Sequence, residues 1–313
     1  MRRSSIFRAG LALAVLFGLQ LAFWRLRLHL PGTPLAEDIV PYAARDLWFE
    51  HTPLALHVAE RLRLAELPLW DPHRLCGLPL LAVPHGASLY PPTLLNALIG
   101  LPAATEVSLI LHLAFAAICT FGFMRSIGAH PAGAFSAALG FAWCSRLVAW
   151  TYQHVWLVGL SWMPATLWLV ERTLCRRPLA ASLLALAIGV QLLTGGTEAV
   201  VFNLYASGSY AAVRLLTLAA RGEARRAVGR GAVLLAAVCL GALLAAPQLL
   251  TSFELAGESA RLERPFDPVA ARAIARPLAS QLEEALAGGA LLALLGLILG
   301  WRLAGARVVW LWA

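Results

Sequence analysis

Two adjacent carboxylates, Glu37 and Asp38, follow the first hydrophobic run of the chain and precede a long polar segment. Asp38 and Tyr42 are four residues apart, so they share a face if this segment is helical, although Pro41 leaves the helix start open. A carboxylate at a boundary between water and an apolar phase suits a general base that deprotonates an alcohol. The structural alternative is a solvated helix start, because acidic residues favour N-terminal turns.

A second group of chemically capable side chains lies in residues 67–92, LPLWDPHRLCGLPLLAVPHGASLYPP. Its six prolines oppose a helix, and its glycines allow close approach of other backbone. Trp70 offers a flat apolar face on which a sugar ring can stack. Donors and acceptors for the same ligand come from Asp71, His73, His85 and Tyr90. The pattern favours a binding surface and, equally, an interfacial loop anchored by its Trp and Tyr.

Three further candidates lie later in the chain. Glu198 follows a glycine pair in LLTGGTEAVV, where a carboxylate between two apolar runs needs a partner or a cavity. Arg261 and Arg264 could bind a phosphate through two hydrogen bonds each, or simply pair with the neighbouring acids. His112, inside an apolar run, is interpreted as a hydrogen-bonded packing residue rather than a catalyst.

Composition indicates the elements that must position these residues. Hydrophobic residues make up 60% of the 313 and charged residues 13%, about half the share typical of a soluble domain. The apolar runs are about 20 residues long and do not alternate, which predicts membrane-spanning helices in an all-α protein. We expect spans at the following positions: 6–28, 104–126, 132–150, 154–174, 179–195, 198–217, 231–252 and 286–303.

The distribution of charge predicts the orientation of these spans. With the N-terminus in the cytoplasm, the inner segments hold 14 of the 25 basic residues, all arginine, and two of the 17 acids, Glu171 and Glu223. This satisfies the positive-inside rule. The net charge of +8 is therefore a topology signal, and no nucleic-acid partner is expected. Two outer segments, about 29–103 and 253–285, are long, and the first has helical spacing typical of amphipathic surface helices.

The order of these motifs resembles the bacterial YfhO-like membrane proteins. The resemblance is carried by PLWDPHRLCGLPLLAVPHGASLYPP, by LILHLAFAA around His112, by GGTEAV and by APQLLTSFELAGESAR, and it covers roughly residues 1–262. It implies a C-type glycosyltransferase (GT-C) fold with about eight or nine transmembrane helices in a single domain, 1–313. Members are usually longer, which predicts a chain truncated at its C-terminus.

The resemblance implies transfer of a sugar from a polyprenyl-phosphate donor to an extracytoplasmic acceptor, a cell-envelope polymer, lipid or protein. Asp38 would be the catalytic acid of the first outer loop, with Glu37 in reserve. Two positions depart from the family: Thr197 stands where a histidine is common, and Cys76 replaces a glycine. We expect no metal and no cofactor besides the lipid-linked donor, membrane lipids as partners, and no indication of oligomeric state. A transporter or flippase, and a non-catalytic scaffold, remain alternatives.

Overall fold

The computed structural model describes residues 47–144, 147 and 153–258, together with a few helical residues between 14 and 22. Most of the predicted span 6–28 and all of the predicted span 286–303 lie outside this part. In the described residues every regular element is a helix, and the only strand-like feature is an isolated antiparallel bridge between Asp71 and Leu78. The all-α class is therefore confirmed.

The helices follow the hydrophobic runs. A π-helical turn, η1 (Leu47–His51), leads into α4 (Thr52–Arg63), and three 3₁₀ turns follow before the long helices. Their bounds are η2 (Leu80–Ala82), η3 (Pro84–Gly86), η4 (Pro91–Thr93), α5 (Leu94–Ile99), α6 (Leu101–Ser126), α7 (Pro131–Ala142), α9 (His154–Ser161), α10 (Met163–Leu174), α11 (Ala180–Leu192), α12 (Thr197–Ala220), α13 (Ala224–Leu244) and α14 (Ala246–Gly257).

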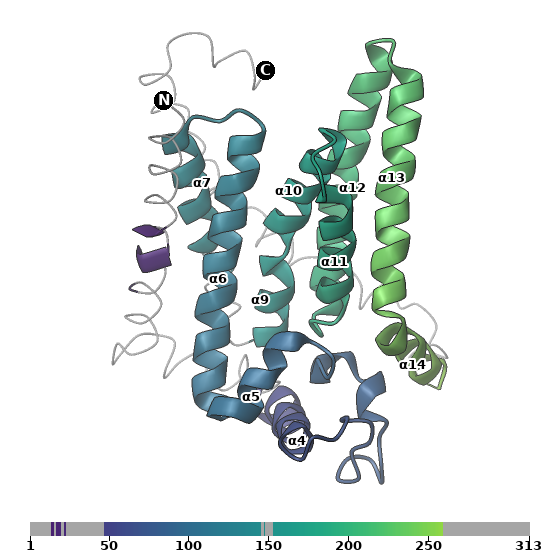
Figure 1. The fold of residues 1–313 in the computed structure, drawn as a ribbon. Coiled ribbons are helices and arrows are strands. Elements are labelled where there is room, and N and C mark those ends of the chain that lie inside the picture. Colours follow the sequence, from purple (N-terminus) through teal and green to yellow (C-terminus); the bar gives the residue numbers. More distant parts are fainter. Residues whose placement is uncertain are drawn as a thin grey trace, which may run out of the picture.

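Helices α6, α7 and α9 to α13 form a bundle, and α4, α5 and α14 gather at one of its ends (Figure 1). We call this the cap end. The α12–α13 turn marks the opposite end, which we call the turn end. Helix α10 packs against α6, α11 and α12, while α11 packs against α13. Gly241 makes that last contact close, because a Cβ there would lie 2.8 Å from the carbonyl oxygen of Ala185.

Two predicted spans are interrupted. The run 154–174 forms two helices, α9 and α10, which meet at Trp162. Pro164 lies in the first turn of α10. The run 231–252 does not continue as one helix, because α13 ends at Leu244 and α14, with Pro247 in its first turn, begins anew at the cap end. Proline lacks the N–H that a continuous helix requires, so both breaks follow from the sequence.

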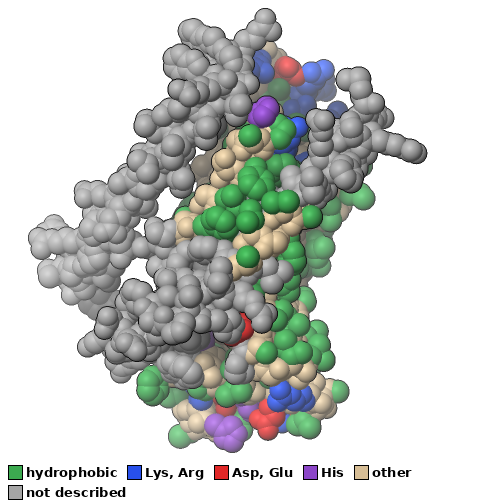
Figure 2. All heavy atoms as spheres, turned by 90° about the vertical axis from the view of Figure 1, so that its left-hand side faces the viewer, with side chains coloured by type: hydrophobic (Ala, Val, Ile, Leu, Met, Phe, Trp, Pro, Cys, Tyr) green, Lys and Arg blue, Asp and Glu red, His purple; other side chains and the backbone are tan. Residues whose placement is uncertain are grey.

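Much of the bundle surface is apolar. Helices α12 and α13 expose large hydrophobic side chains, among them Tyr205, Leu216, Val228 and Leu243. On the face in Figure 2, hydrophobic side chains cover the middle and charged ones gather towards both ends. Two helical segments of the described residues, Ala103–Ser126 and Ala224–Leu244, are long and apolar enough to cross a membrane. The larger number of spans stays a prediction.

Candidate functional site at the cap end

The segment 67–92 folds into a tight loop rather than a free connection. Each of its three 3₁₀ turns lies next to prolines, whose fixed φ favours such turns. The Asp71 carboxylate, on a residue only 3% exposed, accepts the backbone N–H of His73 at 2.9 Å, and the Asp71 backbone exchanges two hydrogen bonds with Leu78. Asp71 therefore stabilises the loop itself.

This loop lies against the ends of three helices. Gly195, with φ of +84°, passes so close to the loop that a Cβ would lie 2.7 Å from the carbonyl oxygen of Pro84. From α14, the Gln248 amide donates to the carbonyl oxygen of Leu81, and the Ser252 hydroxyl donates to that of Ala82 at 2.9 Å. The segment therefore folds back over these helix ends.

Tyr90 joins the loop to the bundle core through a buried chain of hydrogen bonds. Nδ1 of His112 lies 2.6 Å from the carbonyl oxygen of Ser108, which can only accept, so Nδ1 carries the proton. Nε2 of His112 then accepts from the Tyr90 hydroxyl at 2.5 Å, and Trp162 donates Nε1–H to the same hydroxyl at 3.2 Å. Burial raises the pKa of Tyr90, and the Trp162 bond offsets only part of that shift, so Tyr90 is a neutral phenol.

A cavity of about 60 Å³ adjoins this network, between the loop, α4 and the helix ends. Residues 85–92 of the loop form part of its wall. Three histidines from separate elements, His51, His85 and His154, line it. Nε2 of His154 lies 3.2 Å from the Ser108 hydroxyl, which links the cavity to the Tyr90 network. The remaining polar lining residues are Tyr90, Thr93, Asn96, Ser108 and Thr194.

Glu50 supplies the negative charge beside this cavity. Its Oε1 accepts a hydrogen bond from Nδ1 of His85 at 2.9 Å, and the ring of His51 lies edge-on to that of His85 with centroids 5.0 Å apart. Burial acts to raise the pKa of Glu50, but His85, His51 and Arg74 together outweigh it and hold the pKa below its usual value. Glu50 is therefore an ionised carboxylate among several basic groups.

A wider cleft of about 280 Å³ lies on the outside of the same loop. It is lined by Pro53, Leu56, His57, Glu60, Asp71, His73 and Arg74. The rings of His57 and His73 meet edge to face with centroids 5.7 Å apart, and His57 Nε2 lies 3.1 Å from the carbonyl oxygen of Trp70. Among the residues that the structure describes, no group of three His, Cys, Asp or Glu side chains has the geometry of a metal site.

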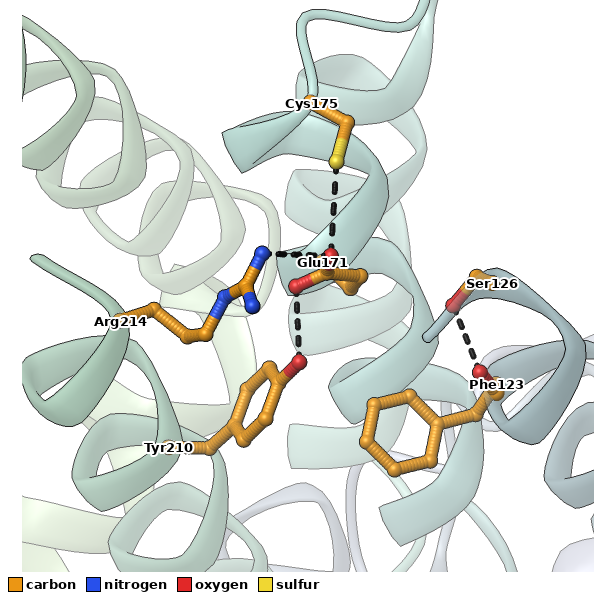
Figure 3. Close-up of polar contacts among 6 residues, drawn as sticks. All are labelled: Phe123, Ser126, Glu171, Cys175, Tyr210 and Arg214. Carbon is orange, nitrogen blue, oxygen red and sulfur yellow. Dashed lines mark hydrogen bonds and ion pairs between the residues drawn. The ribbon is translucent and has the colours of Figure 1, made fainter. Parts of the chain in front are cut away.

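A second buried polar cluster lies near the turn end (Figure 3). The Glu171 carboxylate, on a residue 3% exposed, accepts from Tyr210 at 2.7 Å and from Arg214 at 2.8 Å. The Cys175 thiol donates to the same carboxylate at 3.4 Å. The sequence analysis placed Glu171 among the inner-loop acids, but the structure buries it between α10 and α12. Its partners hold the two helices together.

The predicted site residues that the structure describes fall into three groups. His85 and Tyr90 line the cavity, whereas Asp71 and His73 line the outer cleft and Trp70 lies beside it, 51% exposed with its ring against Gly77. Glu198 is exposed at the start of α12 and accepts from its neighbour Thr197 at 3.2 Å. The remaining predictions lie outside the described residues: Glu37, Asp38, Tyr42, Arg261 and Arg264.

Sequence reasoning missed Glu50, His51 and His154, and it interpreted His112 correctly as a hydrogen-bonded packing residue. The spacing of Ser108 and His112, four apart in one apolar run, marks a shared helix face and could have indicated the network. Glu50 and His51 gave no such indication, because their contacts with His85 join segments that are distant in the sequence.

The chain was compared with models of protein families, with curated proteins and with solved structures, and no match was found in any of the three.

Proposed function

We propose that this protein is a polytopic glycosyltransferase of the GT-C type in the bacterial inner membrane, with its active face outside the cytoplasm. It transfers a sugar from a polyprenyl-phosphate donor to an acceptor hydroxyl of the cell envelope. The observation that carries the proposal is a histidine-lined polar cavity at one end of a helical bundle whose sides are apolar. A site of this kind suits a substrate whose reacting group lies at a membrane surface and whose tail lies in lipid.

The charges at the two ends support the proposed orientation. The turn end carries the exposed Arg221, Arg225 and Arg226, which suits the cytoplasmic side under the positive-inside rule. The cap end holds the carboxylates and histidines of the loop region. An N-terminus in the cytoplasm and a first outer segment of about 29–103 remain part of this proposal.

The reaction would be a direct displacement. The acceptor oxygen attacks the anomeric carbon, the bond from that carbon to the phosphate oxygen breaks, and its electron pair leaves with the phosphate. Asp38 takes the proton of the acceptor hydroxyl as general base. A single displacement inverts the anomeric configuration. The departing phosphate needs positive charge or N–H donors beside it rather than a proton.

Replacement of Asp38 tests this function most simply. Asp38→Asn keeps the size and hydrogen bonding of the side chain but cannot accept the proton, so transfer from a labelled polyprenyl-phosphate sugar should fall about 10²- to 10⁴-fold. Glu37→Gln is the matched control and should retain most activity. The reverse ranking would assign the base to Glu37. Full transfer in the double variant would contradict the mechanism.

A further inference from the structure

His85 binds Glu50 through one ring nitrogen, Nδ1, and its other ring nitrogen, Nε2, is left for a ligand. Nδ1 donates to Glu50 at 2.9 Å, and His85 also lines the cavity. A carboxylate bound to one imidazole nitrogen fixes the ring orientation and stabilises the protonated ring. Nε2 of His85 lies in a position that the Glu50 contact does not use, and an imidazolium ring presents an N–H donor there to an anion.

The groups around His85 make this a basic environment with one anion. His51 and Arg74 both act electrostatically on Glu50, and His154 also lines the cavity. The centroids of the His51 and His85 rings lie 5.0 Å apart, so an anion in the cavity would lie among imidazole groups that can donate hydrogen bonds to it. The cavity volume is about 60 Å³. A single water needs about 10–15 Å³, so the cavity has room for one phosphate-sized group.

The neighbouring surface offers a place for a lipid tail. The turn η4, helix α5 and the first turns of α6 contribute Thr93, Asn96 and Ser108, respectively, to the cavity lining. Helices α5 and α6 also expose large apolar side chains near the cavity: Leu94, Leu98, Ile99, Val107 and Leu111. These side chains offer apolar surface to a long hydrocarbon chain whose polar end reaches the histidines.

From these observations we infer that the cavity is the phosphate subsite of the lipid-linked donor, with His85 as the residue that contacts the phosphate and Glu50 as the residue that positions it. This inference rests on the proposed function and adds the residues that hold its leaving group. It assigns to His85 the role for which Arg261 and Arg264 were the sequence candidates.

Equilibrium binding of a labelled polyprenyl phosphate to the full chain in lipid nanodiscs tests the inference. The critical variant is His85→Asn, because asparagine keeps a donor near the position of Nδ1 but has nothing at the position of Nε2. The matched control is His130→Asn, an exposed histidine beyond the far end of α6 whose role as helix N-cap asparagine also fills. Competition with the matching polyprenol measures how much the hydrocarbon tail contributes to binding. Competition with inorganic phosphate measures how much the phosphate contributes.

We expect the wild-type protein to prefer polyprenyl phosphate over polyprenol by about 10- to 100-fold, as for hydrogen bonds to a charged group. His85→Asn should lose most of that preference, with the same thermal midpoint as His130→Asn, which should keep it. Equal phosphate preference in the two variants would overturn the subsite while leaving the Asp38 test intact. Inorganic phosphate binding as tightly as the lipid would assign the cavity to free phosphate and overturn its place in the reaction. A wild-type protein with neither phosphate preference nor transfer would overturn both proposals.

Discussion

The two polar clusters differ in burial and in the hydrogen-bonding groups that they leave for a ligand: Glu171 is buried, whereas the Glu50 side chain is 41% exposed. At the turn end, the Glu171 carboxylate is enclosed by donors from Tyr210, Arg214 and Cys175, all on α10, α12 or the residue after α10. At the cap end, Glu50 binds one nitrogen of His85, and three histidines line the cavity. A cluster whose members satisfy one another stabilises the helices that carry them, whereas one that borders a cavity can exchange its contacts for a ligand.

The largest effect on stability is expected at Glu171. Glu171→Gln keeps the shape of the side chain but leaves the Arg214 guanidinium without its ionic partner. Breaking a fully buried ion pair costs about 3–5 kcal/mol; because the Arg214 side chain is 45% exposed and can turn to water, we expect about 2 kcal/mol here. The measurement is the thermal unfolding midpoint of the purified protein.

Glu223→Gln is the matched control for that variant. Glu223 pairs with Arg226 three residues later on the surface of the turn end, and such exposed pairs contribute about 0–1 kcal/mol. A midpoint lowered equally by both substitutions would show that burial does not distinguish the Glu171 cluster.

A smaller effect is expected where the cap loop meets the helix ends. Gly195→Ala introduces a Cβ in contact with Pro84 at a residue with positive φ, so the loop must shift away from the α11–α12 turn. Gly128 has a φ of +96° and open space around it, so Gly128→Ala carries the backbone strain without the clash. We expect Gly195→Ala to be the less stable variant by about 1–2 kcal/mol, measured as the difference between their unfolding free energies. Equal stabilities would mean that the loop is not held at this turn.

The sequence was sufficient to predict most of the helices but not the contacts between them. The apolar runs predicted α6, α11 and α12 closely, since helix formation there depends on local composition. The prolines and glycines of residues 67–92 likewise predicted an irregular segment. The breaks at Trp162 and Ala245 were missed because the runs were interpreted by hydrophobicity alone, although Pro164 and Pro247 mark both positions.

The polar clusters could not have been predicted in the same way. The hydrogen-bonded partners are far apart in the sequence. The separation is 35 residues for Glu50 and His85, 43 for Glu171 and Arg214, and 72 for Trp162 and Tyr90. Each contact depends on how the helices pack, which residue type and spacing along one segment do not indicate. Trp70 and His73 had suitable chemistry, yet packing leaves them on the outer side of the loop, away from the cavity.

The most direct test compares the same chemical change in the two clusters, Glu50→Gln and Glu171→Gln, by measuring polyprenyl-phosphate binding and the thermal unfolding midpoint on each protein. We predict that Glu50→Gln weakens binding by about tenfold or more, because His85 loses the carboxylate that fixes the orientation of its ring, and leaves the midpoint nearly unchanged. We predict that Glu171→Gln lowers the midpoint and leaves binding intact at temperatures where the protein is folded. A Glu50→Gln protein that binds the lipid like the wild type, or a Glu171→Gln protein that is folded and has lost binding, would contradict the division between a ligand site at the cap end and a structural cluster at the turn end.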